Sequence, residues 1–134
     1  MGSTNSKGDL AIAKVLLLAT EKGHIISKPL SDSSRYDLVI DDGKLNRTQV
    51  KYANGKATHA DGVVRVGLEK RYKGKILLYS EKDIDLLLVY IPKIDRVCAF
   101  KPDVFAGMNN LYIRCEPSKN GQKSGCIQAA DYFW

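Results

Sequence analysis

The spacing of apolar and polar residues changes along the chain, and these changes predict the order of its helices and strands. Residues 8–22, GDLAIAKVLLLATEK, lack proline and internal glycine and are rich in Leu and Ala, which predicts a helix that ends at Gly23. This segment is apolar on almost all sides, so we expect a sheet to cover most of the helix. Residues 85–91, DLLLVYI, form a continuous apolar run, which predicts a fully buried strand.

The remaining segments predict shorter elements. Residues 24–30, HIISKPL, predict a short strand that is not central in a sheet, because Pro29 has no N–H to donate to a neighbouring strand. Further strands are predicted at 62–68, 96–100 and 111–115, a short helical turn at 101–108, and an aromatic end docked on the core at 129–134. Together these elements predict one α/β domain over residues 1–134, in which helices flank a mixed β-sheet.

Residues 34–53, SRYDLVIDDGKLNRTQVKYA, predict a β-hairpin whose two faces differ in chemistry. Alternation gives the hairpin one largely apolar face, which carries Tyr36, Leu38, Ile40, Thr48, Val50 and Tyr52. Burial of this face fixes the register, since a slip of one residue would invert a whole strand. The same register places Asp37, Gln49 and Lys51 together on the opposite face. It also requires either an odd number of loop residues around Asp42 and Gly43 or a bulge.

Composition and charge narrow the function classes without choosing among them. Lys and Arg number 21 against 15 Asp and Glu, and this net charge of +6 permits nucleic-acid binding but is also common in proteins that carry charge for solubility. No apolar run is long enough to span a membrane. Residues 1–7 lack the pattern of a signal peptide or an anchor, and we expect them to be disordered or partly derived from an expression tag.

The cysteines and histidines argue against a zinc site. Cys98, Cys115 and Cys126 form no CxxC pair, and His24 and His59 are the only histidines. An odd number of widely spaced cysteines favours a reducing environment, so we expect a cytoplasmic location.

The polar face of the hairpin has the residue types that metal-assisted phosphodiester cleavage requires. Asp37 can hold Mg²⁺ through a carboxylate oxygen, Gln49 can add an amide oxygen, and the backbone oxygen of Val50 can complete the protein ligands. Lys51 can lower the pKa of an attacking water or neutralise charge on the phosphate. The alternative is a solvated strand face on which Asp37 and Lys51 pair, and such pairs contribute little to stability.

The hairpin resembles the core motif of the PD-(D/E)xK nuclease superfamily, in a variant with Gln at the second acidic position. More narrowly, the chain is similar to homing endonucleases encoded within bacterial, notably cyanobacterial, group I introns. The similarity extends to the opening helix GDLAIAKV, the hairpin DLLLVYIPKIDRVCAFKPD and the closing segment PSKNGQKSGCIQAADY. The resemblance implies a restriction-endonuclease-like core in which Asp37, Gln49 and Lys51 carry the nuclease motif.

Ile12 departs from the pattern of this family. The opening helix of the family normally reads Gly-x-x-Gly-Glu or close to it, with the Glu directed towards the metal, and Ile12 stands where the acid is expected. Ile12 can be a core residue that packs at helical spacing against Leu16 and Ala19. It can also replace a Glu in order to silence a toxic nuclease, and we favour this second interpretation.

Basic residues after the hairpin are the candidates for contact with double-stranded DNA. They are Lys56, Arg65, Lys70, Arg71, Lys73 and Lys75. Arg65 and Arg71 suit base reading, because a guanidinium group can bind guanine bidentately in the major groove. Phosphate contacts are expected from Arg35, Lys119 and Lys123. A run of charges can also be a solvated loop with no ligand.

These observations predict a Mg²⁺-dependent, sequence-specific double-strand DNA endonuclease of the intron-homing kind. The alternatives are a Holliday-junction or repair nuclease of the same fold and a catalytically silent DNA-binding module. A small domain needs symmetric copies to recognise a long site and to cut both strands, and the resemblance implies a homodimer or a dimer of dimers, with a tetramer favoured. The aromatic residues 131–134 can serve that interface or belong to the core.

Overall fold

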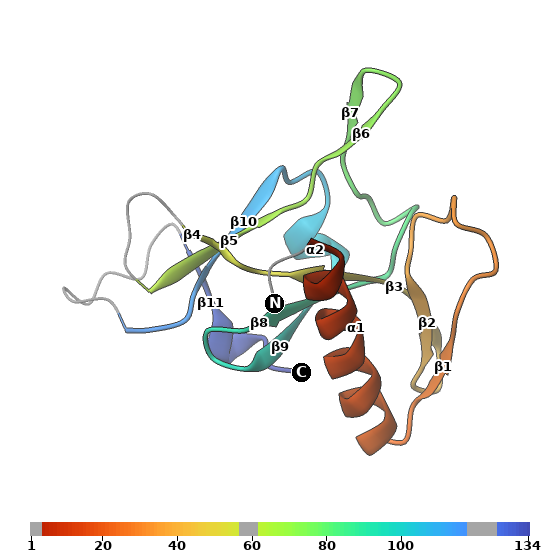
Figure 1. The fold of residues 1–134 in the computed structure, drawn as a ribbon, viewed down its shortest axis with the longest axis horizontal. Helices are drawn as coiled ribbons and strands as arrows, with labels where there is room; N and C mark the ends of the chain where they lie inside the picture. Colours follow the sequence, from red (N-terminus) through yellow and green to blue (C-terminus); the bar gives the residue numbers. More distant parts are fainter. Residues whose placement is uncertain (1–3, 57–61, 118–125) are drawn as a thin grey trace.

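The structure is a computed structural model that describes residues 4–56, 62–117 and 126–134. Its centre is a five-stranded mixed sheet with the order β1-β2-β3-β8-β9 (Figure 1). The strands are β1 (Ile25–Ser27), β2 (Leu38–Asp41), β3 (Leu45–Tyr52), β8 (Leu86–Ile91) and β9 (Arg96–Phe100). β3 and β8 are parallel, and the other neighbours in this sheet are antiparallel. The prediction of an α/β fold with a mixed sheet is confirmed.

A second, four-stranded sheet has the order β11-β10-β5-β4. Its strands are β4 (Gly55–Lys56), β5 (Val63–Gly67), β10 (Asn110–Arg114) and β11 (Ile127–Gln128). The strand predicted at 62–68 therefore lies outside the sheet that holds the hairpin. The short helix α2 (Pro102–Phe105) and the 3₁₀ helix Ala129–Asp131 complete the described elements of the body.

A narrow antiparallel ribbon, β6 (Lys70–Tyr72) and β7 (Lys75–Leu77), projects away from both sheets (Figure 1). Tyr72 pairs with Lys75, and the two turn residues, Lys73 and Gly74, have φ angles of 49° and 77°. Two left-handed residues in a two-residue loop match the hairpin turn whose twist fits the flanking strands. The run of charges, for which a solvated loop was the alternative interpretation, is thus an ordered ribbon.

The opening helix, α1 (Thr4–Glu21), begins four residues earlier than predicted. Residues 4–7, expected to be disordered, are helical, because they include no Pro and continue the helix from Gly8 into its first turn. The predicted end is confirmed. Gly23 has a φ of 77°, and the His24 N–H donates to the Ala19 carbonyl (2.9 Å), which satisfies a backbone acceptor in the last turn. No helix of the described residues is long and apolar enough to cross a membrane.

Strand β8 is buried on both faces, as predicted for residues 85–91. Leu87 and Val89 belong to a first core cluster that includes Val66 of β5 and Ile113 of β10. Leu88 belongs to a second cluster, which includes helix α1 and the apolar face of the hairpin through Ala11, Val15, Leu38, Ile40 and Val50. Helix α1 and the four-stranded sheet thus cover opposite faces of the central sheet.

The predicted register of the hairpin is confirmed. Leu38 pairs with Thr48 and Asp41 pairs with Leu45, which leaves residues 42–44 as a loop with an odd number of residues. One assignment was wrong, because Tyr36 packs against the first cluster and Leu38 against the second. The alternation fails there since β2 begins at Leu38, and the chain bends at residues 35 and 37 before the strand starts.

Candidate active site

Asp37 lies at the bend immediately before β2 and is bound to β3 through three hydrogen bonds. Its backbone N–H donates to the Thr48 carbonyl (2.9 Å). Its carboxylate oxygen Oδ2 accepts hydrogen bonds from Gln49 Nε2 (2.9 Å) and from the backbone N–H of Val50 (3.0 Å). The carboxylate is therefore held in one place by backbone and side-chain donors of the neighbouring strand.

Lys51 lies two residues beyond Gln49, so both side chains leave β3 on the same side. Val50 between them packs with α1, which places Gln49 and Lys51 on the sheet face away from the helix. The Lys51 side chain is half-buried. Burial lowers the pKa of Lys51, the nearby Asp37 carboxylate raises it, and Lys70 lowers it further. The structure thus brings Asp37, Gln49 and Lys51 together, as the alternation of the hairpin predicted.

An aromatic side chain that the sequence analysis missed lies beside Lys51. Lys51 Nζ is 5.6 Å from the centroid of the Tyr79 ring, and the Arg35 guanidinium carbon is 5.0 Å from the same centroid. Arg35 also forms an ion pair with Asp83 (3.5 Å). Tyr79 and Asp83 are about thirty residues from the hairpin in sequence, and no local spacing links them to it. An aromatic residue near a charged segment was the only signal that the sequence offered.

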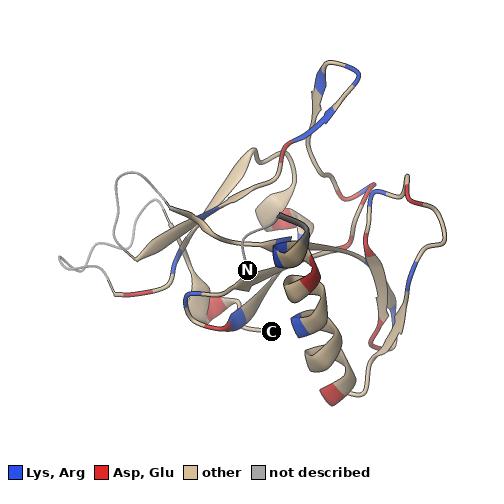
Figure 2. Ribbon diagram, in the orientation of Figure 1, with Lys and Arg blue, Asp and Glu red and all other residues tan. Residues whose placement is uncertain are grey.

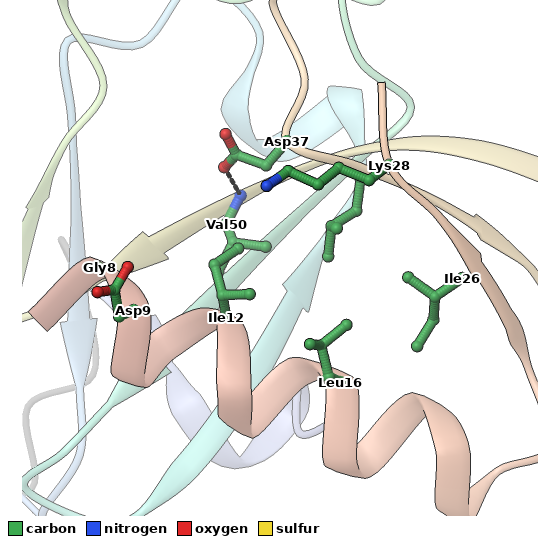
Figure 3. A pocket seen from close by; sticks show the side chains of 9 residues that line it. Gly8, Asp9, Ile12, Leu16, Ile26, Lys28, Asp37 and Val50 are labelled. Atoms are coloured by element: carbon green, nitrogen blue, oxygen red, sulfur yellow. Dashed lines mark hydrogen bonds between the residues drawn. The ribbon is translucent and has the colours of Figure 1, made fainter. Parts of the chain in front are cut away.

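A pocket of about 490 Å³ opens between α1 and the start of the hairpin (Figure 3). The Lys28 side chain extends towards Asp37, and Ile12 and Leu16 form part of the helix wall (Figure 3). Asp9 lies on the same helix, three residues before Ile12. The lining residues are Gly8, Asp9, Ile12, Leu16, Ile26, Lys28, Asp37, Leu38 and Val50. Sequence analysis missed Asp9 and Lys28, although the i, i+3 spacing of Asp9 and Ile12 indicates a shared helix face.

Ile12 fits both interpretations that the sequence left open. It is half-buried and packs against the second core cluster, as a core residue does. It also lines the pocket that contains Asp37, which is where an acid on the opening helix would have to lie. The apolar side chain therefore occupies the helix wall opposite the carboxylate.

The residues at the site fit a hard cation better than zinc. Among the described residues there is no cluster of three or more His, Cys, Asp or Glu side chains that could hold a metal. The Asp37 carboxylate suits Mg²⁺, which usually retains several waters and takes few protein ligands. Gln49 presents Nε2 to Asp37, so its amide would have to turn before its oxygen could join the carboxylate as a ligand. The carbonyl of Val50 as a third ligand stays a prediction.

The predicted DNA contacts fall into separate groups. Lys70, Arg71, Lys73 and Lys75 are exposed on the β6–β7 ribbon (Figure 2). Arg65 is exposed on β5 and donates from Nη1 to Asn110 Oδ1 (3.2 Å). Arg35 is beside the candidate active site. Lys56 ends β4, and its side chain lies outside the described part of the chain, as do Lys119 and Lys123.

Comparison with known proteins agrees with this geometry. The family model described as PD-(D/E)XK endonuclease matches residues 2–133. A comparison with curated proteins finds no match. The structure is similar to that of the bacterial homing endonuclease I-Ssp6803I, with a TM-score of 0.79 and 27% sequence identity, and the match covers 98% of this chain and 89% of that one. The resemblance drawn from the hairpin is confirmed, and the chain belongs to the PD-(D/E)XK endonuclease family.

Proposed function

We propose that this chain is a sequence-specific double-strand DNA endonuclease of the homing kind, which hydrolyses phosphodiester bonds with the help of Mg²⁺. The observation that carries the proposal is the set of contacts among Asp37, Gln49 and Val50, with Lys51 on the same face as Gln49. The match to a homing endonuclease structure supports the specific form of the activity.

Each residue of the site has a chemical task in this proposal. Asp37 and Gln49 would hold the cation, which supplies Lewis acidity and a water of lowered pKa when bound. Lys51 brings a positive charge to the same face, where it stabilises negative charge that develops on the phosphate. Since Lys51 is half-buried, its charge is less screened there than on an open surface.

The β6–β7 ribbon suits the major groove of duplex DNA. A two-stranded ribbon fits within that groove, where base pairs are distinguishable by their donors and acceptors. Four of the predicted DNA-contacting side chains are exposed on this projecting element, and Arg71 is its only arginine. Arg71 is therefore the base reader that we propose on the ribbon, and the lysines neutralise phosphates.

Cleavage of both strands requires two such sites, because each chain contributes one Asp37. We propose a homodimer or a dimer of dimers, with a tetramer favoured, as the assembly that presents them to one duplex. The cytoplasmic location remains a prediction.

A catalytically silent DNA-binding module is the second candidate, and Ile12 favours it. An aliphatic side chain gives no ligand to a cation, so the wall of the pocket lacks the acid of the family pattern. The variant Ile12→Glu separates the two functions. We expect Ile12→Glu to cut a randomised duplex library with Mg²⁺. The matched variant Ile12→Gln has nearly the shape of the Glu variant but no charge, and it should cut far less.

Stability provides an independent readout of the same variant. Ile12 packs against the second core cluster, and burial of a large aliphatic side chain contributes roughly 1–3 kcal/mol. Ile12→Glu should therefore lower the melting temperature in EDTA, and Mg²⁺ should restore part of the loss. If the Glu variant is inert with Mg²⁺, and Mg²⁺ does not raise its melting temperature, the silenced nuclease is rejected. Preferential cleavage of a four-way junction over linear duplex would instead identify a junction-resolving nuclease.

A further inference from the structure

Tyr79 is held rigidly at the edge of the candidate active site. Its side chain is 4% exposed, and its carbonyl accepts a hydrogen bond from the Gly107 N–H (3.0 Å). The next residue, Ser80, donates to Asp83 Oδ2 from its backbone N–H (3.1 Å) and its hydroxyl (3.3 Å). The Tyr79 carbonyl and the Ser80 N–H belong to the same peptide group, so the backbone is fixed directly after the ring. Burial raises the pKa of the Tyr79 hydroxyl, so the ring is neutral.

Two cations from different segments converge on this ring. Arg35 approaches from the bend before β2 at 5.0 Å, and Lys51 approaches from β3 at 5.6 Å. Both distances are within the range of about 6 Å over which a cation is attracted to the face of an aromatic ring. Long flexible side chains lose entropy when they are fixed, and a rigid ring with two favourable contacts offsets that cost. Tyr79 thereby holds together two positive charges from segments before and after Asp37 in the sequence.

Arg35 has hydrogen-bond donors that are unused in the described structure. Its Nη1 contacts Asp83, whereas Nε and Nη2 are buried and have no hydrogen-bond partner among the described residues. Most buried polar groups in proteins are bonded, so these two donors leave Arg35 with unused capacity for an acceptor, and a shift of the side chain would present them to a ligand. Guanidinium groups bind phosphate oxygens through two parallel hydrogen bonds, which is the geometry that Nε and Nη2 offer.

We propose that Tyr79 is a positioning residue that holds Arg35 and Lys51 as a two-cation clamp for one backbone phosphate beside Asp37. The ring itself does not contact DNA. That the bound group is a DNA phosphate rests on the proposed function. The role of Tyr79 rests on its contacts with Arg35 and Lys51 in the free protein. Tyr79 then contributes to binding only through the two cations, and this dependence can be tested.

Proton NMR of the free protein tests, without any DNA, whether the Tyr79 ring holds Arg35 and Lys51. Ring currents should shift the ε-methylene protons of Lys51 and the δ-methylene protons of Arg35 upfield of those of exposed Lys and Arg. Tyr79→Phe should keep both shifts and Tyr79→Leu should abolish them. Tyr72→Leu is the matched control, since Tyr72 also has a lysine over its ring, Lys73 at 5.3 Å, but lies on the exposed ribbon. Lys51 and Arg35 signals at ordinary positions in the wild type would overturn the proposal.

The salt dependence of duplex binding in EDTA tests the clamp. Each lost phosphate contact flattens the slope of log K against log salt by about one. Arg35→Met and Lys51→Met should each have this effect. Tyr79→Leu removes no charge, yet it should flatten the slope by more than one and up to about two, whereas Tyr79→Phe should leave it unchanged. Arg35→Met added to Tyr79→Leu should then change little, because the contact is already lost.

An unchanged slope in a folded Tyr79→Leu protein would overturn the clamp. If that variant does not fold, 3,4,5-trifluorophenylalanine at position 79 keeps the shape of the ring but weakens its attraction for cations. It should flatten the slope relative to Tyr79→Phe, and an equal slope would also overturn the clamp. Failure of the wild-type chain to bind any duplex would reject the proposed function and the clamp together, whereas binding with an unaltered slope rejects the clamp alone.

Discussion

The contact between Arg47 and Asp85 fixes the start of β3 to the segment that carries Tyr79 and Asp83, and we predict that Arg47→Met destabilises the fold. Arg47 Nε and Nη2 donate to the two carboxylate oxygens of Asp85, at 3.0 and 2.9 Å. Nη1 and Nη2 also donate to the carbonyls of Lys82 (2.6 Å) and Glu81 (3.0 Å). The substitution removes these four bonds and keeps the bond from the Arg47 backbone N–H to Asp85 (2.8 Å).

The size of the effect follows from the exposure of the pair. Hydrogen bonds to charged groups contribute about 1.5–3 kcal/mol when buried, whereas fully exposed ion pairs contribute about 0–1 kcal/mol. The Arg47 and Asp85 side chains are 35% and 30% exposed, so water screens the pair and partly replaces the lost bonds. We therefore expect Arg47→Met to cost about 1–2 kcal/mol, which lowers the melting temperature of a domain of this size by roughly 3–8 °C.

Acid provides the decisive assay, because the hydrogen bond from Arg47 is the largest cause that lowers the pKa of Asp85. A carboxyl group with a lowered pKa in the folded state contributes stability above its unfolded pKa, near 3.9, and loses it as the pH falls through the lower folded value. The difference in unfolding free energy between wild type and Arg47→Met should thus be full at pH 7 and shrink below about pH 4.

Denaturant unfolding at several pH values measures this difference, and Arg71→Met on the exposed ribbon is the control for loss of one positive charge. A difference that persists unchanged to pH 3 would mean that Arg47 acts through packing of its aliphatic stem. A difference below about 0.3 kcal/mol at pH 7, within the range typical of exposed pairs, would mean that the contact is only a surface ion pair.

Two predictions concern the proposed activity. Lys51→Met, made in the Ile12→Glu background, should lower cleavage by about 10²-fold or more, the usual scale for a group that stabilises transition-state charge. Single-turnover cleavage at saturating protein measures this, and a nearly normal rate would place Lys51 outside the chemistry. Lys73→Ala should flatten the salt dependence of duplex binding by about one without altering sequence preference, because Lys73 is expected to contact phosphate. A changed preference with an unchanged slope, measured by competition with variant duplexes, would assign Lys73 to base recognition instead.

The parts of the fold that the sequence predicts well are those governed by local alternation. The register of the hairpin follows from burying Leu38 and Val50 on one face, and this register alone brings Asp37 next to Gln49. The double burial of β8 is likewise visible as an unbroken apolar run. These features depend on residues a few positions apart, for which side-chain period and turn length leave one solution.

Features that depend on distant segments or on local bends were not predictable from the same patterns. Tyr36 was assigned to the wrong face because a bend interrupts alternation before β2. Tyr79 reaches Lys51 only through the path of the chain from β7 to β8, which sequence spacing does not encode. The strands of the ribbon were not predicted, because all three residues of β6 are exposed and leave no apolar face to produce a period-two signal.

The closing residues of the chain run along the outer side of β9. Cys98 and Phe133 form an antiparallel bridge, the Ala99 N–H donates to the Tyr132 carbonyl (2.9 Å), and the Trp134 N–H donates to the Val97 carbonyl (2.9 Å). The segment expected to serve either the core or an interface therefore caps the sheet and occupies backbone groups that would otherwise be open to a strand from another molecule. Two copies cannot extend the central sheet through β9 unless this segment is displaced. A central sheet shared between copies would instead have to join at β1, the strand at its opposite edge.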